Sequence, residues 1–368
     1  MTIVRRDPTA GSLAAADIFR GAAETCIESI AYALPERVVT NEDLLKENPT
    51  WDMTRLVART GVLERRVAAI GQTALDLGHQ ACLALDKDDR LRPQEIDALI
   101  FCTETPDHPI PPNACILHDR LQLNTNVMAF DITLACSGFV YALGLARSLL
   151  ASAMARRVLV VTGDTYSRII HPADRASRCL FGDGAAATIV TTSALSGAGP
   201  AQSLAVLDMS FGTSGAQYAR FMVRAGGTRL PRSDETAREV TDRSGNIRTA
   251  EHIEMDGLGV LSFVNATVPR AIRELLQRNG LQTADVGAYV FHQASLVAVE
   301  GIRRSLAITH DQVIFDMSTL GNLVSASVPV ALRRAQDAGR IPHDRTSILC
   351  GYGVGLSWAT ALVQPGNR

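Results

Sequence analysis

Short runs of apolar residues alternate along this chain with longer segments in which apolar residues recur every three or four positions. The short runs have the length and composition of buried strands, and the longer segments have the periodicity of helices that bury one face. The expected strands cover residues 26–35, 96–104, 127–133, 157–164 and 185–192 in the first half, and residues 203–212, 286–293, 312–317, 346–352 and 355–363 in the second. Strands that alternate with helices in this way predict an α/β protein with largely parallel sheets.

The two halves of the chain repeat these patterns in the same order. The run QEIDALIFC in the first half corresponds to TADVGAYVF in the second, and the glycine-rich LFGDGAAATIV corresponds to CGYGVGLSWATALV. A segment rich in Ser, Gly and Ala, TSALSGAGPAQS, lies between the halves and marks their boundary. We therefore expect a duplicated protein with halves at residues 23–195 and 196–368, preceded by a poorly ordered extension at residues 1–22.

The segment from Phe221 to Gly257 breaks the pattern, because it has weak periodicity and many charged residues. It is expected to form surface loops inserted into the second half. Such loops either contact a substrate or form a solvated surface, and the sequence favours neither reading.

Composition narrows the class of protein. Hydrophobic residues make up 46% of the 368 residues and aromatic residues only 5%, which predicts a large core of Ala, Val, Leu and Ile. The formal net charge of −2 gives no electrostatic reason to expect nucleic acid or an anionic membrane as the main partner. No apolar run approaches the ~20 residues that cross a bilayer. The seven cysteines form no C-x-x-C pair and no signal-like segment follows Met1, so we expect free thiols and a cytoplasmic location.

Cys136 stands in the sequence LACSGF, between an expected strand and a long helical pattern at residues 137–154. A cysteine is most often a small buried hydrophobic residue. At the start of a helix, however, unpaired N–H groups and the positive end of the helix dipole favour the thiolate. Cys136 is therefore a candidate nucleophile at the bottom of a cavity.

Two candidate partners for this thiolate occur near the ends of apolar runs in the second half. They are His292 in FHQAS and Asn322 in LGNLVSASVPVAL. Each has a structural alternative, because a histidine after a strand is often structural and a Gly-Asn pair usually marks a turn. Ligands of open α/β sheets collect outside the carboxyl ends of strands, and a thiolate with such partners suits acyl transfer. The eight histidines form no metal-type pair, so no metal site is expected.

Eight motifs, taken in this order, resemble the β-ketoacyl-ACP synthase III family of thiolase-fold condensing enzymes. They are LPERVVTNEDL, RTGVLERR, TETPDHPIPPNAC, DITLACSGFVYAL, DRASRCLFGDGAAA, FHQAS, GNLVSASVPVAL and GYGVGLSW. The resemblance runs from about residue 24 to the C-terminus. It implies a thiolase-like fold in which two duplicated βαβαβαββ halves form a five-layered αβαβα sandwich.

The resemblance also implies a reaction. Cys136 would accept an acyl group from acyl-CoA, and His292 and Asn322 would hold the carbonyl oxygen of malonyl-ACP while carbon dioxide leaves. Condensation would give a 3-oxoacyl thioester, with acyl-CoA as a substrate and no tightly bound cofactor. The backbone N–H groups of Cys136 and Val354 would form the oxyanion hole.

Further residues take roles from the same resemblance. Phe181 would lie beside the nucleophile, and Arg59 and Arg175 would bind the phosphates of CoA. Ile110 would reach across the interface of a homodimer to line the acyl pocket of the partner subunit. The implied partners are therefore acyl-CoA, an acyl carrier protein and a second copy of the chain.

The chain departs from the family pattern at three positions. Arg55 replaces a tryptophan that stacks on adenine, Ser295 replaces the asparagine of HQAN, and Val297 replaces an arginine that docks the carrier protein. Ser295 still forms hydrogen bonds, so we expect retuned rather than abolished activity. Arg303 and Arg304 either supply a different docking patch or form a solvated helix face.

Two alternatives remain open. One is an acyltransferase on the same fold that forms an ester or amide without decarboxylation; the three departures favour it, and the retention of Asn322 argues against it. The other is a non-catalytic subunit of a heterodimer. Such subunits usually lose the cysteine or its partners, whereas this chain keeps them all.

Overall fold

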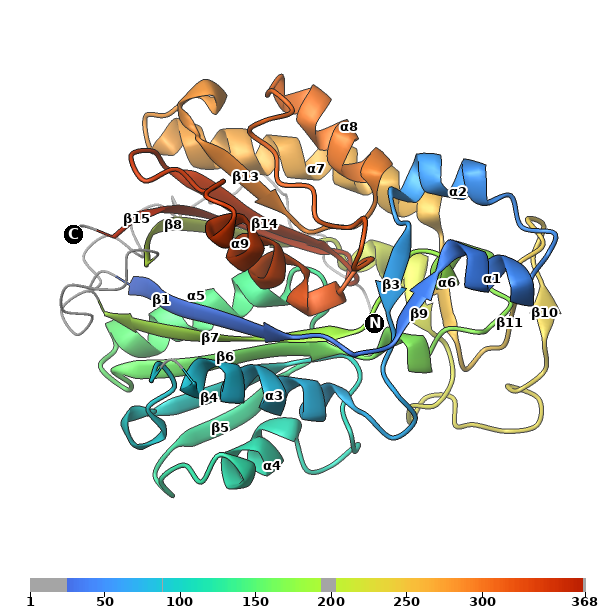
Figure 1. Ribbon diagram of the computed structural model, residues 1–368, viewed down its shortest axis with the longest axis horizontal. Coiled ribbons are helices and arrows are strands. Elements are labelled where there is room, and N and C mark those ends of the chain that lie inside the picture. Colours follow the sequence, from blue (N-terminus) through green and yellow to red (C-terminus); the bar gives the residue numbers. More distant parts are fainter. Residues whose placement is uncertain (1–24, 88, 193–202, 367–368) are drawn as a thin grey trace, which may run out of the picture.

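The computed structural model describes residues 25–87, 89–192 and 203–366. Nine strands form a mixed sheet in the order β13-β14-β15-β8-β1-β7-β6-β4-β5 (Figure 1). The first half supplies β1 (Thr25–Ala33), β4 (Ala98–Cys102), β5 (Met128–Ile132), β6 (Arg157–Asp164) and β7 (Gly184–Thr192). The second half supplies β8 (Leu204–Thr213), β13 (Ala288–Phe291), β14 (Ser347–Gly353) and β15 (Ser357–Pro365). The expected extension at 1–22 and most of the expected boundary segment lie outside the described residues.

The two halves share one order of strands and helices, except that the second half has a single bridge at Val313 where the first half has β5. In the first half α3 (Ala74–Asp86), α4 (Asn113–Arg120) and α5 (Gly138–Ala151) alternate with the strands, which gives βαβαβαββ. In the second half α7 (Gly257–Arg278), α8 (Leu296–Leu306) and α9 (Ser327–Asp337) occupy the equivalent places. The antiparallel neighbours also correspond, because β7 pairs with β1 and β6 as β15 pairs with β8 and β14.

The helices divide the molecule into five layers. We call the sheet strands of the first half of the chain the first half-sheet and those of the second half the second half-sheet. Helices α3 and α4 cover the outer face of the first half-sheet. Helix α7 covers the outer face of the second half-sheet, and α8 packs on α7 (Figure 1). Helices α5 and α9 lie between the half-sheets and contact strands of both. The expected αβαβα arrangement is therefore confirmed. Every residue of β4 and β6 is buried, because helices cover both faces, and this explains their continuous apolar runs.

The expected strand at 312–317 forms only a single bridge, between Tyr289 and Val313. The Tyr289 N–H donates to Gln312 at 2.7 Å, and the Ile314 N–H donates to Tyr289 at 3.0 Å. Beyond that point the side chain of Gln293 takes over: it donates to the Ile314 carbonyl and accepts from the Asp316 N–H. Side-chain hydrogen bonds thus replace the ladder that the apolar pattern predicted.

The remaining elements lie around the end of the sheet that carries the carboxyl ends of β4, β6 and β14. They are β2 (Val38–Thr40), α1 (Asn41–Glu47), α2 (Met53–Thr60), β3 (Glu64–Arg66), α6 (Arg175–Arg178), β9 (Phe221–Val223), β10 (Val240–Thr241), β11 (Ile247–Arg248) and β12 (Ile253–Met255). The segment at 221–257, expected as loops, contains two short antiparallel pairs, β9 with β12 and β10 with β11. It is anchored to the first half through hydrogen bonds from Ile247 N–H to Ala173 and from Ile253 N–H to Ile169.

A buried ion pair joins β1 to β6. Glu28 sits where the register of β1 against β7 shifts, between Ile27 and Ser29. Its carboxylate binds Arg157 through two hydrogen bonds of 2.6 and 3.1 Å, and both side chains are at most 5% exposed. A charge this deeply buried is costly unless its partner stays in place.

We expect Glu28→Gln to lower the free energy of unfolding by about 3 kcal/mol, because it leaves the Arg157 charge buried without its counter-ion. Denaturant titration measures this change. The control is Glu274→Gln on the surface of α7, whose ion pair with Arg270 is about two-thirds exposed. That variant should change stability by less than about 0.5 kcal/mol, and equal losses in the two variants would contradict the assignment.

Candidate active site

Cys136 lies in the turn between β5 and α5, two residues before the helix begins. The Gly138 N–H closes this turn with a 2.8 Å hydrogen bond to the Ala135 carbonyl, and Cys136 is only 3% exposed. The turn packs closely against β14. A Cβ atom added at Gly353 would lie 2.8 Å from the Sγ atom of Cys136, and a Cβ atom added at Gly351 would lie 2.5 Å from the carbonyl oxygen of Cys136. Only glycine leaves room for the cysteine at both positions.

Two backbone N–H groups donate to the sulfur, that of Cys136 itself and that of Val354. Val354 is held in place by Ser357, whose hydroxyl donates to the Val354 carbonyl at 2.8 Å. Ser357 in turn lies 2.8 Å from the hydroxyl of Ser137, next to the cysteine. The structure thus brings together the two residues expected to form the oxyanion hole.

Burial raises the pKa of the Cys136 thiol above its ordinary range, and the charges of Glu104 and Asp164 raise it further. The two N–H groups that donate to the sulfur lower the pKa but do not offset burial. The sequence predicted that the start of the helix favours the thiolate. Burial and the two nearby carboxylates act in the opposite direction and outweigh that effect. In the resting protein the thiol keeps its proton.

His292 follows β13 and is fixed by its backbone. Its N–H donates to the Cys350 carbonyl at 2.7 Å, and its own carbonyl accepts from the Tyr352 hydroxyl at 3.1 Å. The imidazole lies edge-on to the Tyr352 ring, with 5.5 Å between centroids, and its Nδ1 has no partner among the described residues. Burial lowers the pKa of His292 to about 3, so the ring is neutral at physiological pH.

Asn322 is paired with the segment around Phe181. Its N–H donates to the Leu180 carbonyl at 2.9 Å, and its carbonyl accepts from the Gly182 N–H at 3.0 Å. The side-chain Oδ1 accepts from the Val324 N–H at 2.9 Å. This contact orients the carboxamide and leaves its Nδ2 as a donor for a ligand.

These contacts bring the three expected residues around one buried apolar cluster. Cys136, Phe181 and Tyr352 all belong to it. Asn322 is bridged to Phe181, and the imidazole of His292 lies against Tyr352. A thiol, a neutral imidazole and an oriented carboxamide are thus all buried at or beside the same apolar cluster.

Comparison with known proteins identifies the family. Residues 130–215 match the model of 3-oxoacyl-[acyl-carrier-protein (ACP)] synthase III, and residues 276–364 match that of its C-terminal part. The β-ketoacyl-[acyl-carrier-protein] synthase III of Caldanaerobacter subterraneus is 36% identical over 90% of this chain and 95% of its own length. The chain belongs to the β-ketoacyl-ACP synthase III family.

Solved structures agree with this assignment. A crystal structure of a 3-oxoacyl-(acyl-carrier-protein) synthase III is 38% identical, covers 93% of this chain and 99% of its own, and superimposes with a TM-score of 0.87. The priming β-ketosynthase of the R1128 polyketide biosynthetic pathway is 29% identical. It covers 94% of this chain and 98% of its own, with a TM-score of 0.79. The chain is accordingly an acyltransferase of the condensing type with a thiolase-like fold, as the motifs predicted.

In this synthase the expected CoA-binding residues lie on two different elements. Arg55 and Arg59 are exposed on α2, and Arg175 begins α6, where its Nη2 donates to the Ser244 carbonyl of the inserted segment at 3.0 Å. A groove of about 350 Å³ runs between α2 and α8. Its lining includes Ala58 of α2 and Leu296 of α8, only four residues after His292.

Helix α8 carries the other expected contact residues of the synthase. Ser295 caps the helix, since its hydroxyl accepts from the Ala298 N–H at 3.4 Å, and Val297 is 40% exposed in the groove. The guanidinium of Arg303 is held by Glu300 at 2.9 to 3.1 Å, whereas the side chain of Arg304 is 76% exposed. Of the two expected docking arginines, Arg304 therefore offers the more accessible charge.

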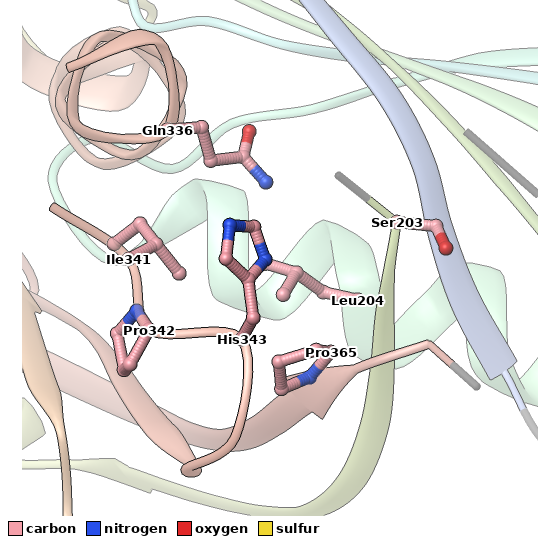
Figure 2. Close-up of a pocket in the computed structure, with 7 residues that line it drawn as sticks. All are labelled: Ser203, Leu204, Gln336, Ile341, Pro342, His343 and Pro365. Atoms are coloured by element: carbon pink, nitrogen blue, oxygen red, sulfur yellow. The ribbon is translucent and has the colours of Figure 1, made fainter. Parts of the chain in front are cut away.

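Ile110 lies apart from the buried cluster, on the loop between β4 and α4, and is 84% exposed. The pocket in Figure 2 is also remote from Cys136. Its lining includes Leu204, His343 and Pro365. Pro365 is the last residue of β15, whereas Ser357, which binds Val354 near the cysteine, is the first, so the length of the strand separates the pocket from Cys136. We assign no part of the reaction to that pocket.

Sequence reasoning missed three polar residues beside the sulfur: Glu104, Asp164 and Tyr166. The Tyr166 hydroxyl donates to the Glu104 carboxylate at 2.5 Å, and the Glu104 N–H donates to Asp164 at 2.8 Å. Glu104 ends the apolar run 96–104, and Asp164 ends 157–164. An acidic residue at the end of a buried strand was the available signal, because such ends collect ligands in this class of fold.

Among the helices of residues 25–87, 89–192 and 203–366, none combines the length and the apolar character needed to traverse a lipid bilayer.

We expect Gly353→Ala to slow acylation of Cys136 by a short-chain acyl thioester at least about 100-fold, because the added methyl group displaces the sulfur. Intact-protein mass spectrometry measures the rate. Gly227→Ala is the matched control, since a Cβ atom there meets nothing within 4 Å. Unchanged acylation of the Gly353 variant would contradict the close approach of the turn to β14.

The pKa values predict how reactivity depends on pH. Because the pKa of the Cys136 thiol is raised, the thiolate fraction should increase about tenfold per pH unit from about pH 7 to 9. Alkylation of Cys136 by iodoacetamide in a Cys115→Ser background, which removes the exposed thiol, measures this rise. A plateau reached below about pH 8 would instead indicate a lowered pKa, and a rise that levels off from about pH 8.5 would indicate an unshifted one.

Proposed function

We propose that this synthase loads an acyl group from acyl-CoA onto Cys136 and condenses it with malonyl-ACP, releasing carbon dioxide and a 3-oxoacyl thioester. The observation that carries this proposal is the set of donors around the thiol. Two backbone N–H groups point at the sulfur, and a neutral His292 and an oriented Asn322 lie at the same buried cluster.

In the first half-reaction the sulfur of Cys136 forms a bond to the acyl carbonyl carbon, and CoA leaves as the free thiol with the proton. The tetrahedral oxyanion binds the N–H groups of Cys136 and Val354. Because the resting thiol is protonated, its proton is lost during attack and leaves with the CoA thiol.

In the second half-reaction the malonyl thioester loses carbon dioxide, and negative charge develops on its thioester oxygen. His292 and the Nδ2 of Asn322 donate to that oxygen, and both donors are neutral. In a dry site preorganised neutral donors stabilise an enolate strongly without requiring a fixed charge. The enolate carbon then attacks the acyl group on Cys136, the carbon–sulfur bond to the cysteine breaks, and the departing thiolate takes a proton from solvent to regenerate the thiol. Phe181 supplies an apolar wall beside the departing carboxylate.

The groove between α2 and α8 is the proposed path of the pantetheine arm. Arg59 and Arg175 would bind CoA phosphates at its mouth, with Arg55 adding charge where no aromatic ring is available for stacking. For the carrier protein we favour Arg304 over Arg303, because Glu300 hydrogen-bonds Arg303 at 2.9 Å but approaches Arg304 only to 3.6 Å, and Arg304 is 76% exposed. Val297 and Leu296 would contribute apolar contact in the groove.

A homodimer is the proposed assembly. Strand β5 is an edge strand that pairs only with β4 among the described residues, so its outer edge presents unpaired backbone groups. The exposed Ile110 lies on the loop that connects β4 to the helix beside this edge. Pairing of two β5 strands would satisfy both edges and carry Ile110 toward the partner subunit. The seven free thiols support the proposed cytoplasmic location.

The competing proposal is ester or amide formation without decarboxylation in a specialised pathway. The similarity to the priming β-ketosynthase of a polyketide pathway, together with Ser295 and Val297, favours a specialised role. The oriented Asn322 favours decarboxylation. Product analysis distinguishes the two, because only condensation evolves carbon dioxide.

We expect His292→Ala and Asn322→Ala each to lower carbon dioxide release from malonyl-ACP at least about 100-fold, because each removes one donor to the enolate. The acyl-enzyme at Cys136 should still form, since its oxyanion is held by backbone N–H groups. His343→Ala, in the pocket of Figure 2, is the matched control and should be unaffected.

Release of labelled carbon dioxide and mass spectrometry of the acyl-enzyme measure the two steps separately. An ester or amide product formed without gas would contradict the proposed condensation. Acylation of Cys136 that requires a second protein would instead support the heterodimer alternative.

A further inference from the structure

We propose that Glu104 and Tyr166 form a polar subsite that selects an acyl group carrying a hydrogen-bond donor, a hydroxyl or an amine, close to its carbonyl carbon. The inference rests on the proposed function, because the acyl group is the one that Cys136 accepts. It concerns which acyl group the enzyme takes, a question that the condensation mechanism leaves open.

The pair lies beside the nucleophile, with Tyr166 buried and Glu104 partly accessible. Tyr166 is 1% exposed and belongs to the same cluster as Cys136 and Phe181, with its ring centroid 5.2 Å from that of Phe181. Its hydroxyl donates to Oε2 of Glu104 at 2.5 Å. Among the charges that act on the Cys136 thiol, that of Glu104 is the largest. The carboxylate therefore lies near the sulfur.

Glu104 has few partners of its own. Among the described residues no cation pairs with it, and Tyr166 is the only donor to its carboxylate. Asp164 accepts a hydrogen bond from the Glu104 N–H, and its carboxylate adds negative charge to the same region. Burial raises the pKa of Glu104, as expected for a carboxyl group without a counter-ion.

The second oxygen of the carboxylate remains open. Oε1 accepts no hydrogen bond within the described parts of the chain, yet Glu104 is partly accessible and this oxygen is not among the fully enclosed unpaired atoms. Buried polar groups are ordinarily paired, so a ligand that fills this space must either supply a donor or leave the oxygen unpaired. A saturated hydrocarbon chain supplies none.

The position of the pair points to the acyl group rather than to the malonyl group. Glu104 follows β4 and Tyr166 follows β6, both in the first half, as Cys136 does. His292 and Asn322, which hold the malonyl carbonyl in the proposed reaction, come from the second half. We therefore place the pair against the acyl group that Cys136 carries, rather than against the malonyl group.

The test compares three acyl-CoA thioesters of matched length: butyryl-CoA, 3-hydroxypropionyl-CoA and β-alanyl-CoA, which end in a methyl, a hydroxyl and an ammonium group. Rates of Cys136 acylation are measured by intact-protein mass spectrometry. We expect the hydroxyl or the ammonium chain to load at least about 10-fold faster than butyryl in the native protein. The faster of the two identifies the donor.

Glu104→Leu should reverse this order, so that butyryl loads fastest, because an apolar wall no longer needs a donor. Glu104→Gln keeps an acceptor oxygen without the charge, and it should retain the preference for hydroxyl but lose that for ammonium. Glu274→Leu on the surface of α7 is the matched control and should leave the ratios unchanged. A melting temperature of the Glu104 variants within about 3 °C of that of the native protein verifies that the chain has folded.

Equal or faster loading of butyryl by the native protein would overturn the inference, and so would an unchanged ratio in Glu104→Leu. Failure of all three thioesters to load Cys136 would overturn the proposed function itself. That result differs from loss of selectivity, so the two failures can be told apart.

Discussion

The site depends on the close approach of one turn to one strand. The backbone at Cys136 packs directly on Gly351 and Gly353 of β14, where any side chain would overlap the cysteine. This contact places a residue of the first half against the second half, and it aims the Val354 N–H at the sulfur. Within the described residues, the strands of the two halves pair with each other only through β1 and β8, from Thr25–Val206 to Ile27–Leu204. The relative position of the two halves therefore depends largely on the contacts of the helices and of this turn.

Burial is the common cause of the unusual electrostatics. The same scarcity of water raises the pKa of Cys136, lowers that of His292 and raises those of Glu104 and Asp164. Each group is pushed toward its neutral form. Chemistry that relies on neutral donors suits such a place, because charge then develops only in the transition state and finds dipoles already oriented.

Asp164 ties this chemistry to the scaffold. Its carboxylate accepts from the N–H of Glu104 and from the hydroxyl of Ser325, at 2.8 and 2.5 Å. Ser325 follows Asn322 by three residues, so Asp164 connects the end of β6 to the turn that orients the carboxamide. One buried carboxyl group thus positions elements from both halves. In the proposed reaction the first half supplies the nucleophile and the polar pair beside it, and the second half supplies the donors for the malonyl carbonyl.

The sequence by itself determined the order of strands and helices, the duplication and the candidates Cys136, His292 and Asn322. Apolar runs and the order of motifs can be read from the sequence without knowledge of how the chain packs. The sequence did not determine the single bridge at Val313, because a distant side chain, that of Gln293, satisfies the backbone there. Nor did it determine the protonation of Cys136, since the start of the helix is visible in the sequence but the surrounding burial and the charge of Glu104 are not. Glu104 and Tyr166 lie 62 residues apart, and only the packing of β4 beside β6 brings them together. Tertiary structure decides such features because they arise from contacts between segments that no local pattern relates.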